Sequence, residues 1–211
     1  MHEERTMNRR EFFNSMADTW DSRCRYDHDK INEILDLLPI QSGDAVLDVG
    51  AGTGILIPFL LERIGDKGFI TAIDMADKMI SIAKSKFSNE NVLFVAGDVF
   101  TADLQPPRFD VIICYSVFPH FDDKKDSVVK LAELLKTGGI MAICHSRGRE
   151  QINSLHKTKS PAVAHDYLPT SWEIEEHLDI AGCETVTIVD TERLFVVAGL
   201  KTHSMGDLTW V

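Results

Sequence analysis

The sequence predicts an α/β fold: a three-layer sandwich with a seven-stranded, mostly parallel sheet, an antiparallel last strand and helices on both faces. Short apolar runs alternate with amphipathic helical segments between residues 45 and 146. This alternation is typical of a parallel sheet covered on both faces. Two more strand-like runs, residues 184–190 and 193–201, follow with only a few residues between them. Parallel neighbours need a connection of about a dozen residues, so these two strands must pair antiparallel.

The chain begins with predicted helices. In residues 7–21 the bulky side chains recur at helical spacing, at Phe12, Phe13, Met16 and Trp20. Residues 31–38 place apolar side chains on one face before Pro39 ends the helix. We therefore expect residues 1–30 to form a helical cap in front of the alternating core.

The predicted core follows in order from residue 45. Its first five strands are residues 45–50, 68–74, 91–98, 109–116 and 138–146. Its helices are residues 55–64, 76–87, 125–136 and 171–183. The chain contains no linker or repeat, so residues 1–211 are predicted to be one domain. Within it, residues 31–201 form the core and residues 145–170 form a lid or insert.

Composition narrows the class of protein. The fractions of hydrophobic (44%) and charged (26%) residues are those of an ordinary globular protein, and no apolar stretch is long enough to cross a bilayer. The N-terminus lacks the apolar segment of a secretory signal, so we expect a cytoplasmic protein without a membrane partner. The net charge of −11 disfavours nucleic acid as a partner. The four cysteines form no CxxC pair and are expected to be free thiols.

A glycine-rich loop, LDVGAGTG at residues 47–54, follows the first core strand and opens a helix. Gly50, Gly52 and Gly54 let backbone approach a ligand closely, although a tight turn would use the same residues. A dinucleotide fingerprint needs a small residue where this chain has Ile55. Asp48 would repel a pyrophosphate and attract a cationic ligand.

Four motifs stand in order at strand ends: DVGAGTG, the acid Asp74 in ITAIDMA, GDV at residues 97–99, and YS at residues 115–116. Together they resemble class I S-adenosylmethionine-dependent methyltransferases, which have a Rossmann-like fold, and the resemblance runs from residue 32 to residue 201. VFPHF and AHD are similar to a poorly described, histidine-rich subgroup of these enzymes.

The resemblance implies S-adenosylmethionine as cofactor and assigns roles at each strand end. Asp74 would accept from the ribose hydroxyls, and Asp98, after Gly97, would accept from the adenine amine. Val99 and Met75 would pack on the adenine ring, and Tyr115 ends the fourth core strand. Asp48, Gly50 and Gly52 would face the methionine end, which Trp20 would cover. The alternatives are a turn role for Asp74, a helix cap for Asp98 and simple core packing for the N-terminal helix.

Histidines gather at the same predicted edge of the sheet, at His120, His145, His156 and His165. Three hypotheses compete for them. They could be polar residues of a substrate lid. One could be a general base, and His145 and His120 are the catalytic candidates, with His156 as a further possibility. All four could instead hold a divalent metal such as zinc or iron, with Asp166 beside it, that lowers the pKa of a thiol or hydroxyl acceptor.

The sequence therefore predicts a methyltransferase that acts on the oxygen, sulfur or metalloid of a small molecule. No DPPY- or NPPF-like run follows the fourth core strand, which disfavours a nucleic-acid amine as acceptor. Two alternatives stand beside this prediction. One is a non-catalytic sensor that binds S-adenosylmethionine or a metal, and the other is a nicotinamide-dependent oxidoreductase. A monomer or a homodimer is expected.

Overall fold

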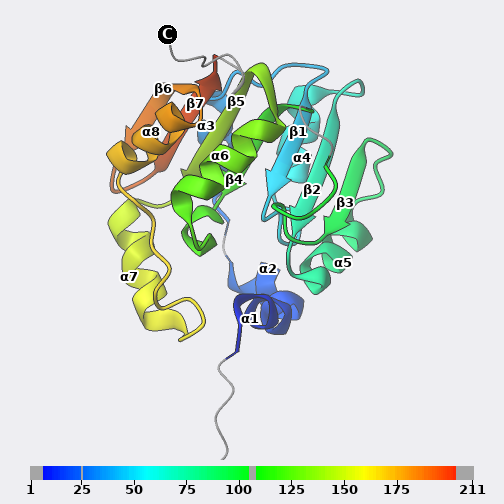
Figure 1. The fold of residues 1–211 in the computed structure, drawn as a ribbon. Coiled ribbons are helices and arrows are strands. Elements are labelled where there is room, and N and C mark those ends of the chain that lie inside the picture. Colours follow the sequence, from blue (N-terminus) through cyan, green and yellow to red (C-terminus); the bar gives the residue numbers. More distant parts are fainter. Residues whose placement is uncertain (1–6, 25, 105–107, 203–211) are drawn as a thin grey trace, which may run out of the picture.

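The computed structural model describes residues 7–24, 26–104 and 108–202 (Figure 1). Seven strands form one sheet in the order β3-β2-β1-β4-β5-β7-β6. The strands are β1 Ala45–Val49, β2 Phe69–Asp74, β3 Val92–Ala96, β4 Phe109–Tyr115, β5 Leu135–His145, β6 Cys183–Asp190 and β7 Phe195–Lys201. The first six residues of the predicted cap and residues 203–211 lie outside the described residues.

The predicted direction of the strands is confirmed. β1 to β5 run parallel, whereas β7 is antiparallel to both of its neighbours, β5 and β6. The short turn at residues 191–194 allows only this antiparallel pairing of β6 and β7. β7 inserts between β5 and β6, so that β6 lies at the edge of the sheet.

Helices cover both faces of the sheet. The helical elements are α1 Arg9–Met16, η1 Ala17–Thr19, α2 Trp20–Arg23, α3 His28–Asp36, α4 Ile57–Ile64, α5 Asp77–Lys86, η2 Phe118–His120, α6 Lys124–Leu134, α7 Arg149–Lys159 and α8 Ser171–Ile180. The apolar side chains of α3 and α4 join one buried cluster, and those of α6 and α8 join the cluster on the opposite face. The predicted three-layer sandwich is therefore confirmed.

The N-terminal segment departs from the single helix expected over residues 7–21. It divides into α1, the single turn η1 and the short helix α2. The hydroxyl groups of Ser15, Thr19 and Ser22 each donate to the carbonyl three residues earlier. Such local bonds compete with regular helical hydrogen bonding, and they accompany the break here.

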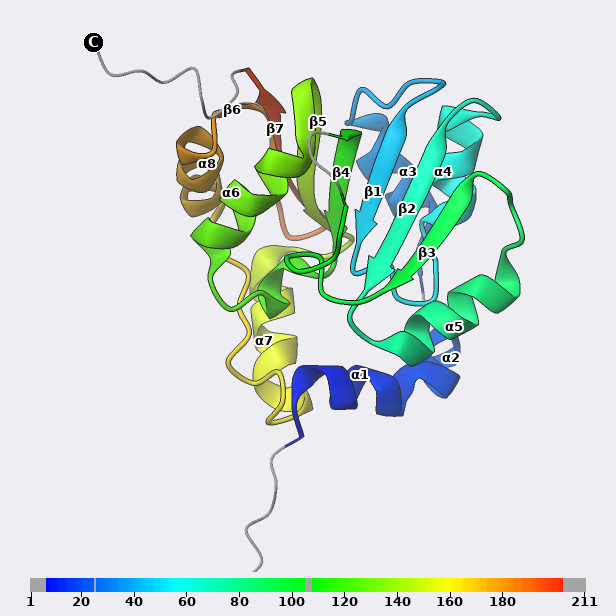
Figure 2. The same cartoon turned by 45° about the vertical axis from the view of Figure 1, so that its right-hand side comes forward.

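The elements outside the sandwich gather at one end of the sheet. Figures 1 and 2 both show α1, α2 and α7 below the arrowheads of the parallel strands, at their carboxyl ends. Ligands of open α/β sheets bind at this edge. In the described part of the chain, each helix falls short of the length and apolar character that a membrane span requires.

Candidate functional site

The glycine loop begins directly after β1, and both its backbone angles and its close packing require glycine. Gly50, Gly52 and Gly54 all have positive φ angles, of 69°, 55° and 86°. A Cβ atom on Gly50 would lie 2.4 Å from Cγ2 of Val117, so no side chain fits there. Close packing thus accounts for Gly50, whereas a Cβ on Gly52 would meet nothing nearer than 3.9 Å, the Nε1 atom of Trp20.

Asp74 ends β2 and ties the glycine loop to the next turn. Its carboxylate accepts from the backbone N–H of Gly52 (2.9 Å) and of Ala76 (2.8 Å). Burial raises the pKa of Asp74, and these two hydrogen bonds act in the opposite direction. The turn role considered for Asp74 is therefore present, and it places the carboxylate beside the loop.

Asp48 has an unusual environment for a carboxylate. Its side chain is buried, and among the described residues no group donates a hydrogen bond to its Oδ2 atom. Burial, followed by the neighbouring charge of Asp74, raises the pKa of Asp48 to about 7. A buried oxygen without a donor is costly, and a cationic group of a ligand would satisfy it. This carboxylate therefore fits the ammonium group of S-adenosylmethionine.

The motif after β3 lies on a more open surface. Asp98 is exposed, and its Oδ1 accepts from the N–H of Phe100, so the capping role considered for it is present. Gly97 donates its N–H to the carbonyl of Asp74, and a Cβ on Gly97 would meet no atom within 4 Å. Val99 is buried and Met75 is 40% exposed. Open space therefore adjoins the tips of β2 and β3.

The end of β4 carries Tyr115 and Ser116. Tyr115 is buried in the cluster on the α3 and α4 face, and burial raises its pKa to about 12. Ser116 has a φ angle of 60°, which residues other than glycine rarely adopt. It is held by its N–H, which donates to the carbonyl of Cys144. The chain thus turns sharply just before Val117 packs on the glycine loop.

The N-terminal cap lies against the glycine loop. Trp20 is near Gly52, and its Nε1–H donates to the hydroxyl of Tyr26 (2.7 Å). Asp21 accepts from the hydroxyl of Thr53 in the loop and pairs with Lys86 of α5 at 2.8 Å. The cap is thus attached both to the loop and to the helix beyond it.

A second polar group lies at the same edge of the sheet, nearer α7. His120 ends η2, and its Nδ1 is 2.6 Å from Oδ2 of Asp166. Arg9 of α1 donates from Nε and Nη2 to the same carboxylate, at 2.6–3.2 Å, and from Nη1 to Asp122. Burial acts to raise the pKa of Asp166, but the hydrogen bonds from His120 and Arg9 hold it at about 2. Asp166 is therefore an ionised carboxylate, although its side chain is buried.

His145 ends β5 and is buried beside these groups. Neither of its ring nitrogens has a hydrogen-bond partner among the described residues. Burial, followed by the nearby His120 and His156 rings, lowers the pKa of His145 to about 3, so its ring is neutral. The rings of His120 and His156 lie 5.1 Å apart, and Nδ1 of His156 is 3.1 Å from the carbonyl oxygen of Asp166.

The predicted metal centre of His120, His145, His156 and His165 is not supported. His165 is exposed, whereas the other three histidines lie near one another. Within residues 7–24, 26–104 and 108–202, no group of three or more His, Cys, Asp or Glu side chains could hold a metal ion. Asp166, the acid expected beside the metal, is engaged instead by Arg9 and His120.

Sequence reasoning missed Arg9 as a site residue. It lies 157 positions from Asp166 and belongs to a helix that was expected only to cover the cofactor. No local pattern connects the two residues. Only the charge of Arg9 at the start of a helix placed over the carboxyl edge could have indicated this pairing.

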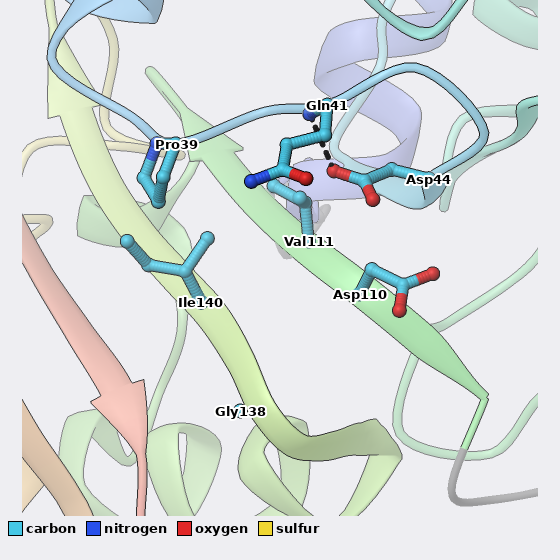
Figure 3. Close-up of a pocket in the computed structure, with 7 residues that line it drawn as sticks. All are labelled: Pro39, Gln41, Asp44, Asp110, Val111, Gly138 and Ile140. Atoms are coloured by element: carbon cyan, nitrogen blue, oxygen red, sulfur yellow. Dashed lines mark hydrogen bonds between the residues drawn. The ribbon is translucent and has the colours of Figure 1, made fainter.

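The pocket drawn in Figure 3 lies at the opposite end of the sheet, beside the start of β1 and β4. It is lined by Pro39, Gln41, Asp44, Asp110, Val111, Gly138 and Ile140. Both of its carboxylates are already engaged: Asp44 accepts from the N–H of Gln41, and Asp110 accepts from Ala45 and Lys136. This pocket therefore offers no free charged group to a ligand, and the candidate site is at the carboxyl edge.

The family follows from a comparison with known proteins. A family model described as a methyltransferase domain matches residues 40–186, which is more than half of the chain. The chain therefore belongs to this family of methyltransferase domains.

Curated relatives agree with this assignment, and a solved structure shares the fold. The chain is similar to a malonyl-[acyl-carrier protein] O-methyltransferase of Acetivibrio thermocellus, with 35% identity over 68% of this chain and 50% of that protein. It is also similar to the mitochondrial ubiquinone biosynthesis O-methyltransferase of Schizosaccharomyces pombe, with 30% identity over 65% and 54% of the two chains. The chain thus spans about half the length of these relatives. A crystal structure of a SAM-dependent methyltransferase from Aquifex aeolicus shares the fold, with a TM-score of 0.70, 22% identity and coverage of 90% and 98%.

Proposed function

We propose that this protein is an S-adenosylmethionine-dependent methyltransferase and that its acceptor atom is an oxygen of a small molecule. The observation that carries the proposal is the match of residues 40–186 to a methyltransferase domain. The named relatives are O-methyltransferases, which favours oxygen over sulfur or a metalloid. The chain covers only part of those relatives, so the identity of the acceptor is left to experiment.

The donor would lie along the tips of β1, β2 and β3. Asp48 supplies a buried carboxylate oxygen to which no residue of the described ranges donates, and this suits an ammonium group. Asp74, at the end of β2, would recognise the ribose. Asp98, just after β3, would recognise the adenine. The open space beside Gly97 leaves room for the base. Trp20, beside Gly52, would cover the methionine end.

The acceptor would lie between the donor and the histidines. His145 offers a neutral ring whose two nitrogens have no hydrogen-bond partner within the described part of the chain, so the ring can orient a polar acceptor. His120, whose Nδ1 is bonded to Asp166, would take the proton of an acceptor hydroxyl at Nε2. When bound, S-adenosylmethionine supplies an electrophilic methyl group: the acceptor oxygen bonds to the methyl carbon, the carbon–sulfur bond breaks and its electron pair stays on sulfur. Alignment of the reactants away from water would provide most of the rate enhancement.

The test has a binding arm and a turnover arm. Calorimetry should show binding of S-adenosylmethionine and S-adenosylhomocysteine and none of NAD. Three acceptor panels are then tested for transfer of radiolabelled methyl: phenols and alcohols, small carboxylic acids including a malonyl thioester, and thiols. Transfer is expected to one of the two oxygen panels. Binding without transfer to any panel would favour the sensor alternative. Exclusive transfer to thiols would overturn the assignment of oxygen.

A further inference from the structure

Three segments that are far apart in the chain meet at one carboxylate. Asp166 comes from the loop after α7, His120 from η2 after β4, and Arg9 from the first turn of α1. From this juxtaposition we infer that Asp166 is a positioning residue that fixes the tautomer of His120, and that Arg9 completes this unit from the N-terminal cap. The inference rests on the proposed function, because it specifies how the acceptor side of that site is prepared.

The direction of the hydrogen bond follows from charge. An ionised carboxylate accepts hydrogen bonds and cannot donate them. Asp166 is ionised at any ordinary pH, since its pKa is held at about 2. The 2.6 Å contact must therefore be donated by Nδ1–H of His120 to Oδ2 of Asp166. In the neutral ring this leaves Nε2 without a proton and able to accept one.

Arg9 makes the buried carboxylate tolerable. The side chain of Asp166 is 1% exposed, and a buried charge without a partner is strongly unfavourable. Arg9 approaches both carboxylate oxygens through Nε and adds a 2.6 Å bond through Nη2, which is a forked, charge-assisted contact. Its remaining arm reaches Asp122, which is 89% exposed and contributes little to the buried pair.

The cap also holds the ring of His120 from the side. Phe13, in the same helix as Arg9, packs edge-to-face on the His120 ring with centroids 5.0 Å apart. On other sides His120 and Asp166 are faced by His145, by His156 and by the buried cation Lys124, which the charge of Asp166 attracts. One helix thus supplies both the charge partner of Asp166 and an apolar wall for the imidazole.

The consequence is that the cap belongs to the acceptor side as well as the donor side. Through Asp21 it contacts the glycine loop, and through Arg9 it contacts the loop that holds Asp166. Docking of the cap therefore assembles both halves of the site together. A chain with a displaced cap would lose the fixed orientation of His120 even with an intact sheet.

The test reads the tautomer directly. In protein labelled with ¹⁵N-histidine, long-range ¹H–¹⁵N spectra in the presence of S-adenosylhomocysteine should show His120 protonated at Nδ1 and unprotonated at Nε2 when neutral. His120→Gln assigns the signals. In Asp166→Asn the Nδ1–H form should lose its dominance, whereas in the matched control Asp122→Asn it should persist. Arg9→Lys should retain the pattern better than Arg9→Gln.

Two outcomes would overturn the inference. One is a wild-type His120 protonated at Nε2, a result that needs no variant and so stands even if Asp166→Asn fails to fold. The other is an unchanged tautomer in a folded Asp166→Asn variant. Failure of the proposed function is a separate result, because it appears as absent binding of S-adenosylhomocysteine in calorimetry of the wild-type protein.

Discussion

The role proposed for Asp48 conflicts with stability. Its buried oxygen has no donor within the described residues, and its pKa is raised to about 7 because burial disfavours the charge. A folded-state pKa above the unfolded value means that the folded protein holds the proton more tightly. Stability contributed by this group is therefore greatest at low pH and falls as pH rises from about 4 to about 7.

Replacing Asp48 with Asn should raise the stability of the donor-free protein and weaken donor binding. The charge costs at most about 4 kcal/mol above pH 7, by the conversion of a pKa shift to free energy. We expect Asp48→Asn to melt higher than wild type at pH 8, with the difference shrinking toward pH 4. Calorimetry should show S-adenosylhomocysteine binding about tenfold weaker or worse. A variant that binds the donor normally would contradict the role given to Asp48.

His120 should matter for turnover and hardly for donor binding. Nε2 of its ring would accept the acceptor proton, and loss of a general base costs about 10²- to 10⁴-fold in rate. We expect His120→Gln to lower kcat by such a factor toward a phenol or alcohol while the Kd for S-adenosylhomocysteine stays within about twofold of wild type. His28→Gln, an exposed histidine on α3, is the matched control and should keep full activity. An equal loss in both variants would remove His120 from the mechanism.

At the scale of elements, much of the fold was predictable because strands and helices here carry strong local signals. β1 to β5 are apolar runs, the first three of which end at glycine or acid, and each was placed to within a few residues. The break of the N-terminal segment into α1, η1 and α2 was not predictable from side-chain spacing. Its hydroxyl-to-carbonyl bonds become visible only in the folded backbone.

The attachment of α2 to the glycine loop gives a prediction about the cap. Asp21 bridges Thr53 of the loop and Lys86 of α5. An exposed ion pair is worth only about 0–1 kcal/mol, so Asp21→Asn should leave the global melting temperature nearly unchanged. We expect faster hydrogen exchange in residues 9–23 and weaker donor binding by a few fold. Asp18→Asn, an exposed acid in the same segment, is the control. Unchanged exchange in Asp21→Asn would show that the cap is held by its apolar contacts alone.

At the scale of the whole molecule, the site depends on contacts between distant segments. The tips of β1 to β4 could be aligned from the sequence because parallel strands must end at one edge. The pairing of Arg9 with Asp166 could not, since neither residue carries a local signal for a partner 157 positions away. The same reason explains why His165 was grouped with the other three histidines in the predicted metal centre. Packing buries His145 and leaves His165 exposed, and only the folded loop decides between them.

Lys201 links the end of β7 to the junction of α6 and β5, and it should be important for global stability. Its side chain is buried, and its Nζ donates to the carbonyl of Ala132 in the last turn of α6 and to that of Leu135, the first residue of β5. In Lys201→Met these buried carbonyls lose their donor. Leaving a buried acceptor without a donor costs about 1–3 kcal/mol of the free energy of unfolding. Urea unfolding should show a loss in this range, with donor affinity unchanged in the folded protein because the contact is remote from the glycine loop. Lys157→Met, at an exposed position on α7, should change stability by no more than about 0.5 kcal/mol. If Lys201→Met were as stable as wild type, the ammonium of Lys201 would merely offset its own burial, and the apolar contacts of β7 and α6 would suffice to hold that end of the sheet.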